Sequence, residues 1–427
     1  MTPTAAKPPS RWDSGILSRV PALQHRDFRI LWFGMFFSSG TMMFQFYAQG
    51  WFILSLASSA ALLGMLGVVR GAGMLIFSLY GGVLADRMDR RRLLMVTQSI
   101  ALGIYAVLSA LIIADRISLW GAFVLIFLSA SAESVDGPAR QALIPHLVPR
   151  EHLPNAISLF IAAQISAYAF LPPFAGIAIE QIGTGGAFAV SLLGHAAVII
   201  ALLMMKTRAT IPLAGREALP KAVAAGIRYA AQRRQVLWLL SYGFFVGALG
   251  FPIISTLAPY WMKNELGLDA SSWTLMGWAW GGGTVVSTVF LSTRRTFTHL
   301  GPTVLVGSAG FALTLLVFGL TRDIRLAAIA WSLNGTFFSA NMIASTSLLQ
   351  VIVANQYIGR VTSLRTLSGA LNQLTAAPLG AVGDAVGMSK LVPGIAALLA
   401  FLVIAPPLLW TAARDFARHE PDPPAAG

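Results

Sequence analysis

Long stretches without a single charged residue constrain this chain more than any other feature. A helix needs about 20 mainly apolar residues to cross a membrane, because its backbone polar groups must all be satisfied within the segment. The first charge-free stretch, residues 30–69, is long enough for two such helices with a turn near residues 55–59, and the second continues past Arg70 to residue 85. Ten more stretches follow, at residues 93–114, 117–132, 153–179, 181–205, 235–262, 270–293, 296–321, 326–359, 366–383 and 391–413. The sequence therefore predicts an all-α membrane protein with twelve transmembrane helices.

The overall composition agrees with this prediction. Hydrophobic residues make up 56% of the 427 residues and charged residues only 11%, whereas a soluble domain carries roughly 25% charged residues. The absence of cysteine excludes disulfide bonds and thiolate metal sites. The six histidines are dispersed, without an HExxH or Walker A pattern in the chain. We therefore expect no metal, no cofactor and no enzymatic activity.

The basic residues are unevenly distributed between the two sides of the expected membrane. If the N-terminus is cytoplasmic, 24 of the 30 Lys and Arg residues fall in the terminal segments and even-numbered loops, and five fall in the odd-numbered loops. Cytoplasmic loops of membrane proteins carry such an excess. The sequence thus predicts a multi-pass protein of the cytoplasmic (inner) membrane with both termini in the cytoplasm. The same distribution explains the net charge of +13 without a nucleic-acid partner.

A polar segment at the midpoint divides the chain. It contains Pro212, Gly215 and Pro220, followed by a basic amphipathic stretch that could lie on the membrane surface or be a plain solvated linker. An offset of 205 residues aligns apolar positions in residues 141–159 with those in 346–364. We therefore expect two pseudo-symmetric six-helix halves. The expected division is a cytoplasmic N-terminal segment (1–27), an N-terminal half (28–205), the linker (206–234), a C-terminal half (235–413) and a cytoplasmic tail (414–427).

A charged motif follows the second expected helix. Residues 82–92 read Gly-Val-Leu-Ala-Asp-Arg-Met-Asp-Arg-Arg-Arg, which resembles the signature that the major facilitator superfamily carries between helices 2 and 3. The superfamily prefers glycine where this chain has Asp89. The resemblance implies the major facilitator fold and transport by alternating access. Anchoring by positive charge would explain the arginines, but not Asp86 at its fixed spacing.

The resemblance also implies a cytoplasmic gate. Asp86 ends helix 2, where the helix dipole disfavours an anion, so it needs cationic or N–H partners. In the superfamily this aspartate contacts the start of helix 11, expected here near residues 365–367. The second arginine, here Arg90, pairs with an acid that ends helix 4, here Asp136. The residues assigned to the gate are Asp86, Arg87, Arg90, Arg91, Asp136, Arg140 and Arg360.

Further segments resemble the bacterial drug-exporter and siderophore-exporter branch of the superfamily. Residues 136–145 and 153–156 are similar to the loop after helix 4 of that branch, and residues 359–361 to its counterpart after helix 10. Exporters also carry a Gly-Pro…Gly pattern in helix 5. This chain has Pro172 and Gly176, with leucine in place of the first glycine. The resemblance implies export of a small molecule by proton antiport.

Arg70, Glu133 and Asp136 lie within the expected membrane helices, where a charge costs about 2.5–3.5 kcal/mol on insertion scales. Glu133 and Asp136 share a face of helix 4 and disfavour each other's charge, so Glu133 could bind and release a proton near neutrality. Alternatively, Glu133 is hydrated at the cytoplasmic boundary and paired with Arg140. Arg70 lies about 24 Å along helix 2 from Asp86, and we expect it to be too far from Glu133 for direct pairing. It could bind an anionic substrate group, close an outer gate, or extend to the outer interface. Proton coupling is assigned to these three residues.

Helices 1, 4, 7 and 10 line the central cavity in superfamily members. In this chain, helices 1 and 10 carry amides there, and helices 1 and 7 carry aromatic residues. Amides with aromatic neighbours suit an amphipathic organic ligand, although each amide could instead be an interhelical hydrogen bond. The expected substrate-binding residues are Gln45, Gln49, Phe44, Tyr242, Asn334 and Asn341.

These observations favour a proton-driven exporter of an amphipathic small molecule that works as a monomer in the lipid bilayer. An importer of the same fold is the first alternative, because the direction of transport is poorly encoded in sequence. A membrane-embedded enzyme or lipid-handling protein is a second alternative, but no catalytic cluster converges in the chain. A receptor that keeps the transporter fold without flux is a third.

Overall fold

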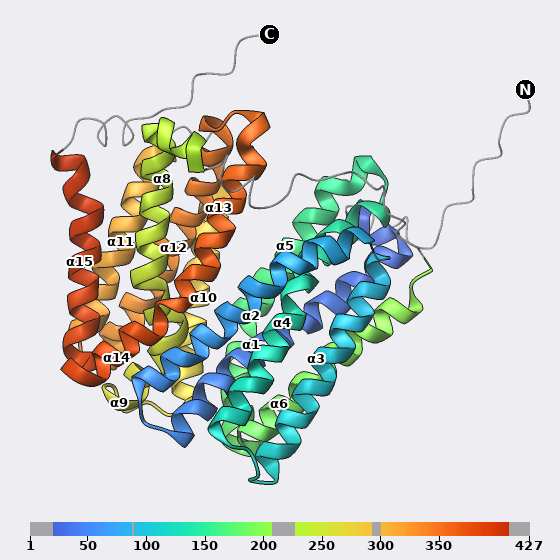
Figure 1. The fold of residues 1–427 in the computed structure, drawn as a ribbon, viewed down its shortest axis with the longest axis horizontal. Helices are drawn as coiled ribbons and strands as arrows, with labels where there is room; N and C mark the ends of the chain where they lie inside the picture. Colours follow the sequence, from blue (N-terminus) through green and yellow to red (C-terminus); the bar gives the residue numbers. More distant parts are fainter. Residues whose placement is uncertain (1–19, 88, 207–226, 293–299, 410–427) are drawn as a thin grey trace, which may run out of the picture.

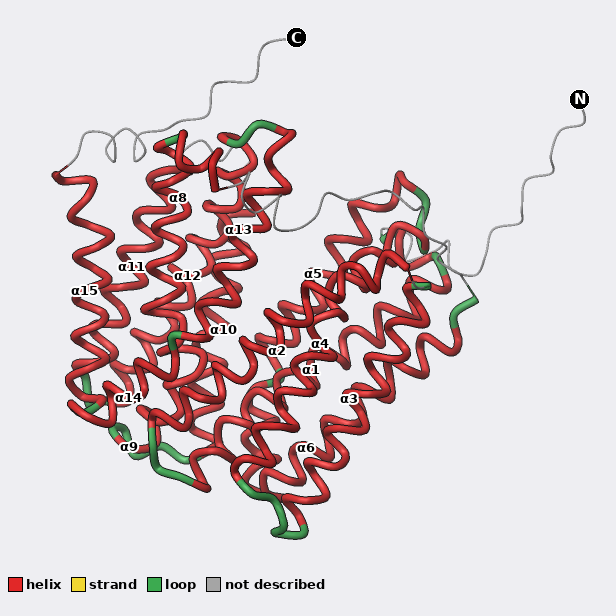
Figure 2. Tube along the Cα trace, viewed as in Figure 1, coloured by secondary structure: helices red, strands yellow, loops and turns green. Residues whose placement is uncertain are grey.

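The computed structural model describes residues 20–87, 89–206, 227–292 and 300–409 (Figure 1). Most of the expected N-terminal segment, most of the linker and the whole tail lie outside these residues. Within them the chain is helical and has no strand (Figure 2). Seven helical stretches of this part are long and apolar enough to cross a membrane. The protein is therefore an all-α membrane protein, as the sequence predicts.

A first group of helices comes from the N-terminal part of the chain. Its members are α1 (Arg26–Leu56), α2 (Ala60–Arg87), α3 (Arg90–Ile113), α4 (Leu119–Leu143), α5 (Leu153–Phe170) and α6 (Pro172–Met204), with short turns at η2 (Pro21–Gln24), η3 (Ile144–His146) and η4 (Arg150–His152). Helix α1 packs along α6 and α2 along α4, while α3 contacts both α4 and α6. Gly183 interrupts α6 with a φ of +72°, a conformation that glycine adopts without strain. The expected fifth helix thus extends across α5 into the first part of α6.

A second group comes from the C-terminal part. It contains α8 (Arg234–Phe245), η5 (Val246–Gly250), η6 (Ile253–Leu257), α9 (Ala258–Asn264), α10 (Ala270–Ser292), α11 (Leu300–Leu320), α12 (Ile324–Ile352), α13 (Asn355–Leu374), α14 (Ala376–Val386) and α15 (Met388–Leu409). Helix α12 packs on α10 and α11, and α15 packs on α11. The two π-helical segments η5 and η6 flank Pro252. Proline lacks the N–H that a regular helix needs, and wider turns accommodate its loss.

Two helices differ from their expected bounds, and both differences affect the site. Helix α12 ends at Ile352 and α13 begins at Asn355, so residues 359–361 lie inside α13 and not in a preceding loop. The expectation that residues 365–367 begin a helix is therefore wrong. Helix α4 continues to Leu143, seven residues beyond Asp136. Asp136 was taken as the end of the helix, yet α4 continues through it and pairs it with Arg140 one turn later.

The first and last described residues lie at the same end of the molecule, which we call the termini end, and the opposite end is the distal end (Figure 1). The two groups stand apart at the termini end and meet at the distal end (Figure 1). Contacts between the groups join α2 to α13 and α14, and join α5 and α6 to α10. These contacts place the helices around the pocket described next.

Candidate functional site

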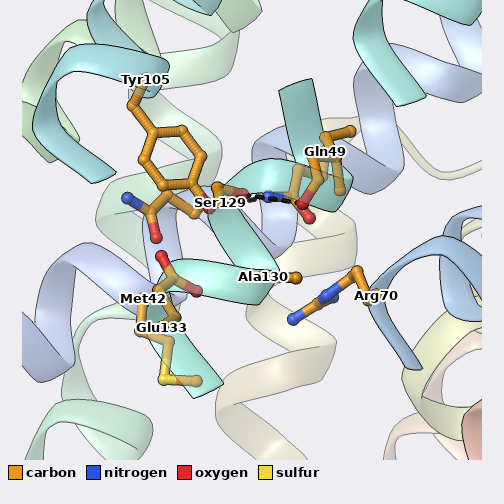
Figure 3. A pocket seen from close by; sticks show the side chains of 9 residues that line it. Met42, Gln49, Arg70, Tyr105, Ser129, Ala130 and Glu133 are labelled. Atoms are coloured by element: carbon orange, nitrogen blue, oxygen red, sulfur yellow. Dashed lines mark hydrogen bonds between the residues drawn. The ribbon is translucent and has the colours of Figure 1, made fainter. Parts of the chain in front are cut away.

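A small polar pocket lies among the helices of the first group. Its lining comes from α1 (Met42, Gln45, Gln49), α2 (Arg70), α3 (Tyr105) and α4 (Ile126, Ser129, Ala130, Glu133). Figure 3 shows the polar side chains directed into this space from several sides. Gln49 Nε2 donates a hydrogen bond to the Tyr105 hydroxyl at 3.2 Å. The Gln49 Oε1 is buried and has no hydrogen-bond partner, so the pocket holds an unused acceptor.

Arg70 and Glu133 enter this pocket from different helices (Figure 3). In the described part of the chain, neither residue forms an ion pair. The charges that act on Glu133 are those of Arg70, Asp136 and Arg140, and Arg70 also lies 5.5 Å from the centre of the Phe46 ring. Arg70 and Glu133 thus line one pocket without a direct ion pair, which the sequence also did not predict. Glu133 lies about 15 Å from the end of α4, because α4 continues beyond Asp136, and it lines the same pocket as Arg70.

A chain of buried polar contacts connects the pocket to the middle of α4. Asp136 pairs with Arg140, and its Oδ1 accepts a hydrogen bond from Gln98 Nε2 at 2.9 Å. Gln98 Oε1 lies 2.8 Å from His195 Nδ1. His195 Nε2 lies 2.7 Å from Gln45 Nε2, and Gln45 lines the pocket. Four helices, α1, α3, α4 and α6, thus contribute to one hydrogen-bonded chain.

Sequence reasoning did not select Gln98 or His195. One signal was present: a histidine within an apolar helix costs free energy unless it is hydrogen-bonded, which makes it a candidate functional residue. His195 is 3% exposed, and its ring stacks on Tyr105 with centroids 5.6 Å apart. Its two partners come from α1 and α3, and only the folded structure brings these helices together.

Among the gate residues whose side chains are described, the expected pair of Arg90 with Asp136 is not formed. Asp136 pairs with Arg140, whereas Arg90 contacts His146 at 2.6 Å. Arg91 donates to the Leu203 carbonyl oxygen at 3.3 Å, near the end of α6. The difference arises because Asp136 lies within α4 and not at its end. The side chains of three further gate residues lie outside the described part of the structure, namely Asp86, Arg87 and Arg360.

The amides of the second group are used inside that group. Asn334 Nδ2 donates to the Phe311 carbonyl oxygen at 3.0 Å, and its Oδ1 accepts from Trp280 Nε1 at 3.2 Å. Asn341 Nδ2 donates to the Val304 carbonyl oxygen at 3.1 Å. Both side chains therefore join α12 to its neighbours, and neither lines the pocket.

The two expected aromatic ligand contacts also lie outside the pocket lining. Tyr242 is 1% exposed and stacks on Trp238 with centroids 6.0 Å apart. Phe44 is partly buried against the main hydrophobic core. Of the expected substrate-binding residues, the pocket thus brings together Gln45 and Gln49 alone.

Asp384 of α14 links the two groups at the distal end. Its Oδ1 accepts from the Ala60 N–H at 2.8 Å, and its Oδ2 accepts from the Ser59 hydroxyl at 2.6 Å and the Ala61 N–H at 3.0 Å. The N–H groups of Ala60 and Ala61 are the first of α2 and have no partner within their own helix. A carboxylate is stabilising there, because it satisfies the N–H groups and complements the helix dipole.

Glu180 of α6 makes the converse link. Its Oε1 accepts from the Ser271 N–H at 2.8 Å, at the start of α10. The neighbouring Ser272 N–H donates to Asp269 Oδ1 at 2.8 Å, so α10 is capped by one carboxylate from each group. Each group therefore supplies an acid to the N-terminus of a helix in the other group.

Aromatic side chains close the space next to these links. The centroid of the Trp273 ring of α10 lies 4.7 Å from the ring centroid of Tyr47 and 5.8 Å from that of Trp51, both on α1. The Lys263 ammonium lies 5.3 Å from the centre of the Trp51 ring. Together these contacts keep the first and second groups packed against each other at the distal end.

The proline and glycine of the expected helix-5 motif lie at the beginning of α6. Pro172 occupies its first turn, a position that needs no N–H donor. A Cβ on Gly176 would lie 2.0 Å from the Thr274 hydroxyl and 2.9 Å from the Ser271 Cα. Gly176 therefore allows α6 and α10 to approach closely where the two groups meet.

Residues 17–418 match the protein family described as transmembrane secretion effector. The chain belongs to this family. Membership confirms the resemblance to the major facilitator superfamily and establishes the protein as a membrane transporter.

Named relatives and solved structures agree with this assignment. The chain is 24% identical over 358 residues to the multidrug efflux pump Tap of Mycolicibacterium fortuitum, which covers 79% of this chain and 84% of Tap. It is 30% identical over 129 residues to the staphyloferrin A transporter of Staphylococcus aureus, which covers 29% of this chain and 32% of that relative. A bacterial homologue of the human lysosomal transporter Spinster superposes with a TM-score of 0.69 at 16% identity, covering 93% of this chain and 98% of the homologue. A bacterial homologue of the iron transporter ferroportin, in its inward-facing state, superposes with a TM-score of 0.68 at 16% identity, covering 92% of this chain and 99% of the homologue.

Proposed function

We propose that this transmembrane secretion effector exports an amphipathic small molecule from the cytoplasm by proton antiport. The proposal includes twelve membrane crossings in two six-helix halves, with both termini cytoplasmic and the distal end outside. The observation that carries it is Glu133, a carboxyl group in a pocket within the helices, with Arg70 nearby and no ion pair to hold its charge. Such a group can exchange a proton for a ligand.

The contacts between the two groups support alternating access. At the distal end Asp384 and Glu180 cross between the groups, so this side is closed and the pocket is reached from the termini end. In the complementary state these links break, and the basic residues around Asp86 close the cytoplasmic side. The membrane transporter thereby exposes one pocket to each side in turn.

Proton and substrate compete for the pocket in this scheme. With the pocket open to the cytoplasm, Glu133 releases its proton and its carboxylate becomes a binding group for substrate. After the conformational change, a proton from the outside neutralises Glu133 and weakens that binding. Arg70 is available to an electronegative part of the same ligand, and Asp136 stays paired with Arg140 throughout.

The names of the relatives guide the choice of test compounds. Tap is a multidrug efflux pump, and two partial matches are a staphyloferrin A transporter and a macrolide efflux protein. A test panel therefore includes ethidium, a macrolide and staphyloferrin A. Uptake of each is measured in inverted membrane vesicles, with and without an imposed proton gradient. Accumulation driven by an acidic vesicle interior indicates export, whereas gradient-driven depletion would indicate the importer alternative.

The decisive variant is Glu133→Gln, which keeps the size of the side chain and removes its titration. We expect gradient-driven accumulation to be lost while exchange of substrate across the membrane continues, because the neutral amide weakens binding as the protonated carboxyl does but cannot couple it to a proton. Glu151→Gln is the matched control, since Glu151 lies in η4 at the termini end, away from the pocket. Gradient-driven transport at the normal rate in Glu133→Gln would exclude Glu133 from coupling.

A further inference from the structure

The buried chain from Asp136 to Gln45 fixes the direction of each of its hydrogen bonds. Asp136 is ion-paired with Arg140, so it is ionised and can only accept. The amide nitrogen of Gln98 must therefore face Asp136, which leaves Gln98 Oε1 to accept from His195 Nδ1. Neutral His195 consequently carries its proton on Nδ1, and its Nε2 accepts from the Gln45 amide nitrogen.

These hydrogen bonds determine which amide atom of Gln45 faces the pocket. The Gln45 Nε2 is used by His195 at 2.7 Å and by the Ser191 hydroxyl at 3.4 Å. The Gln45 Oε1 is therefore left for the pocket, where Gln49 Oε1 is also an acceptor without a partner. With Glu133, the pocket presents three acceptors on two helices. A ligand that fits them brings N–H or O–H donors.

Protonation of His195 would reverse the Gln45 amide. Both ring nitrogens of a charged imidazole are donors, and Nδ1–H can keep its bond to Gln98. Nε2–H then needs an acceptor, which Gln45 can supply only by turning its oxygen away from the pocket. The amide NH₂ group then enters the pocket, so an acceptor is replaced by a donor.

We propose that His195 is a specificity-determining switch: when it is neutral the pocket binds an amphipathic amine through its N–H donors, and when it is protonated that binding is lost. The inference rests on the proposed function, because it explains how substrate loaded at cytoplasmic pH is released on a more acidic side. It assigns the ligand chemistry, a primary or secondary amine on an apolar body.

The groups that face His195 are few. Helices α1 and α6 contribute uncharged Gln45 and Ser191, and α3 contributes Gln98 and the phenol of Tyr105. The charges that act on it, Asp136 and Arg140, both come from α4. Helices α5 and α10 also contact α6, but their described residues bring no charged group to His195.

The first test examines the position of the proton directly. Full-length protein with ¹⁵N-labelled histidine is reconstituted in lipid, with the other five histidines replaced by glutamine so that only His195 reports. At pH 8 we expect the ¹⁵N shifts of the Nδ1–H tautomer, which is the minor form of free histidine. The Nε2–H tautomer would overturn the proposal, because Gln45 would then already present its nitrogen to the pocket.

The second test examines the ligand. Binding of dansylcadaverine, an amphipathic primary amine, is compared with that of its trimethylammonium analogue, which has the same charge and the same sulfonamide but no N–H donor on its ammonium group. Both are measured in nanodiscs between pH 8 and pH 3, in the Glu133→Gln background so that residue 133 does not titrate. Affinity for the primary amine should fall by roughly tenfold on acidification, as for a lost hydrogen bond to a charged group. Affinity for the quaternary analogue should change little.

His195→Asn is the variant that separates a switch from a structural role. Its amide can still donate to Gln98 but carries no titratable group. We expect the pH dependence of dansylcadaverine binding to disappear while binding at pH 8 remains. An unchanged pH dependence in His195→Asn, or equal pH responses of the two probes, would overturn the proposal. Both outcomes are independent of whether Glu133→Gln abolishes gradient-driven transport, so the two proposals can fail separately.

Discussion

The two ends of the molecule are held by different chemistry. At the distal end, Asp384 and Glu180 reach from one group of helices to the N-terminus of a helix in the other. At the termini end, the described polar contacts stay within one group or the other: in the first group His25 contacts His152 at 2.9 Å and Arg90 contacts a further histidine, and in the second group the Ala354 N–H donates to the Tyr229 hydroxyl at 3.1 Å. The distal contacts therefore resist separation of the groups, whereas those at the termini end stabilise one group alone.

This difference shows how a helical membrane protein can close one side without a large apolar interface. A carboxylate at a helix N-terminus satisfies several N–H groups at once, and it is exchanged for water when the helices part. The link is thus strong when formed and can be broken without leaving buried polar groups unpaired. It gives alternating access a contact that exists in one state only, which is what biases a two-state equilibrium.

The largest effect is expected from Gly176→Val. The added side chain would overlap the backbone of α10 at Ser271, which cannot yield by changing a rotamer. The distal end should then fail to close, and transport should be lost. Because the chain has no cysteine, spin labels can be placed at will on the distal ends of α6 and α10 to measure their separation. Gly103→Val is the control, since nothing lies within 4 Å of a Cβ there. An unchanged distance in Gly176→Val would show that the close approach is not required.

A smaller but clear effect is expected from Asp384→Ala. It removes three hydrogen bonds between the groups, so the closed distal state should lose about 1.5–3 kcal/mol, the range for bonds to a charged group. Labels on α2 and α14 should report a larger population of long distances. Asp323→Ala is the matched control, because Asp323 caps α12 within the second group through the Leu326 N–H at 2.9 Å. Equal distance distributions in the two variants would contradict a special role for the contact between groups.

Glu180→Gln should act in the same direction with less effect. The amide oxygen can still accept from the Ser271 N–H, and only the charge is lost, which costs about 0.3–1 kcal/mol at a helix N-terminus. The same labels on α6 and α10 apply. Asp269→Asn makes the corresponding change in the acid that caps α10 from its own group. If both variants open the distal end equally, the effect comes from capping α10 and not from linking the groups.

The smallest effect concerns acid sensitivity of the termini end. Burial and the neighbouring His152 lower the pKa of His25, and burial and Arg90 lower the pKa of His146. A histidine whose pKa is lower in the folded protein than in the unfolded chain stabilises the fold at pH values above its unfolded pKa of about 6.5. This stabilisation is lost as the pH falls from there through the folded pKa. Hydrogen exchange, corrected for intrinsic rates, should therefore increase below pH 6 around residues 21–29 and 144–153. Replacing His25 and His152 with glutamine should remove part of this increase.

The distal end provides the comparison in the same experiment. Hydrogen bonds from Ser271 and Ser272 lower the pKa of Asp269, so its cap on α10 should persist at pH values where the histidines are already charged. Protection of residues 270–273 is therefore expected to stay constant from pH 7 to pH 5. Loss of protection at both ends over the same pH range would mean that the two ends respond as one cooperative unit.

Much of the fold could be predicted from the sequence, but less of the site. The charge-free stretches located the helices. Gln45 and Gln49, which were expected to bind substrate, both line the pocket, and their contact with substrate stays a prediction. The same reasoning placed Asn334 and Asn341 in a cavity, whereas the structure uses both as ties between helices. The sequence of an apolar helix does not show whether its amide side chain binds a ligand or forms a hydrogen bond to a carbonyl of a neighbouring helix.

The sequence by itself determined that this chain crosses a membrane as helices, because in lipid each backbone polar group must be satisfied within its own segment. That requirement is local, so length and composition are sufficient to read it. Only the tertiary structure decided that His195 meets Gln98, that Glu133 and Arg70 share a pocket, and that Asp384 caps α2. Those partners depend on how helices far apart in the chain rotate and cross, because side-chain hydrogen bonds reach only about 3 Å. Small changes in packing therefore select the partner, and no local pattern records that choice.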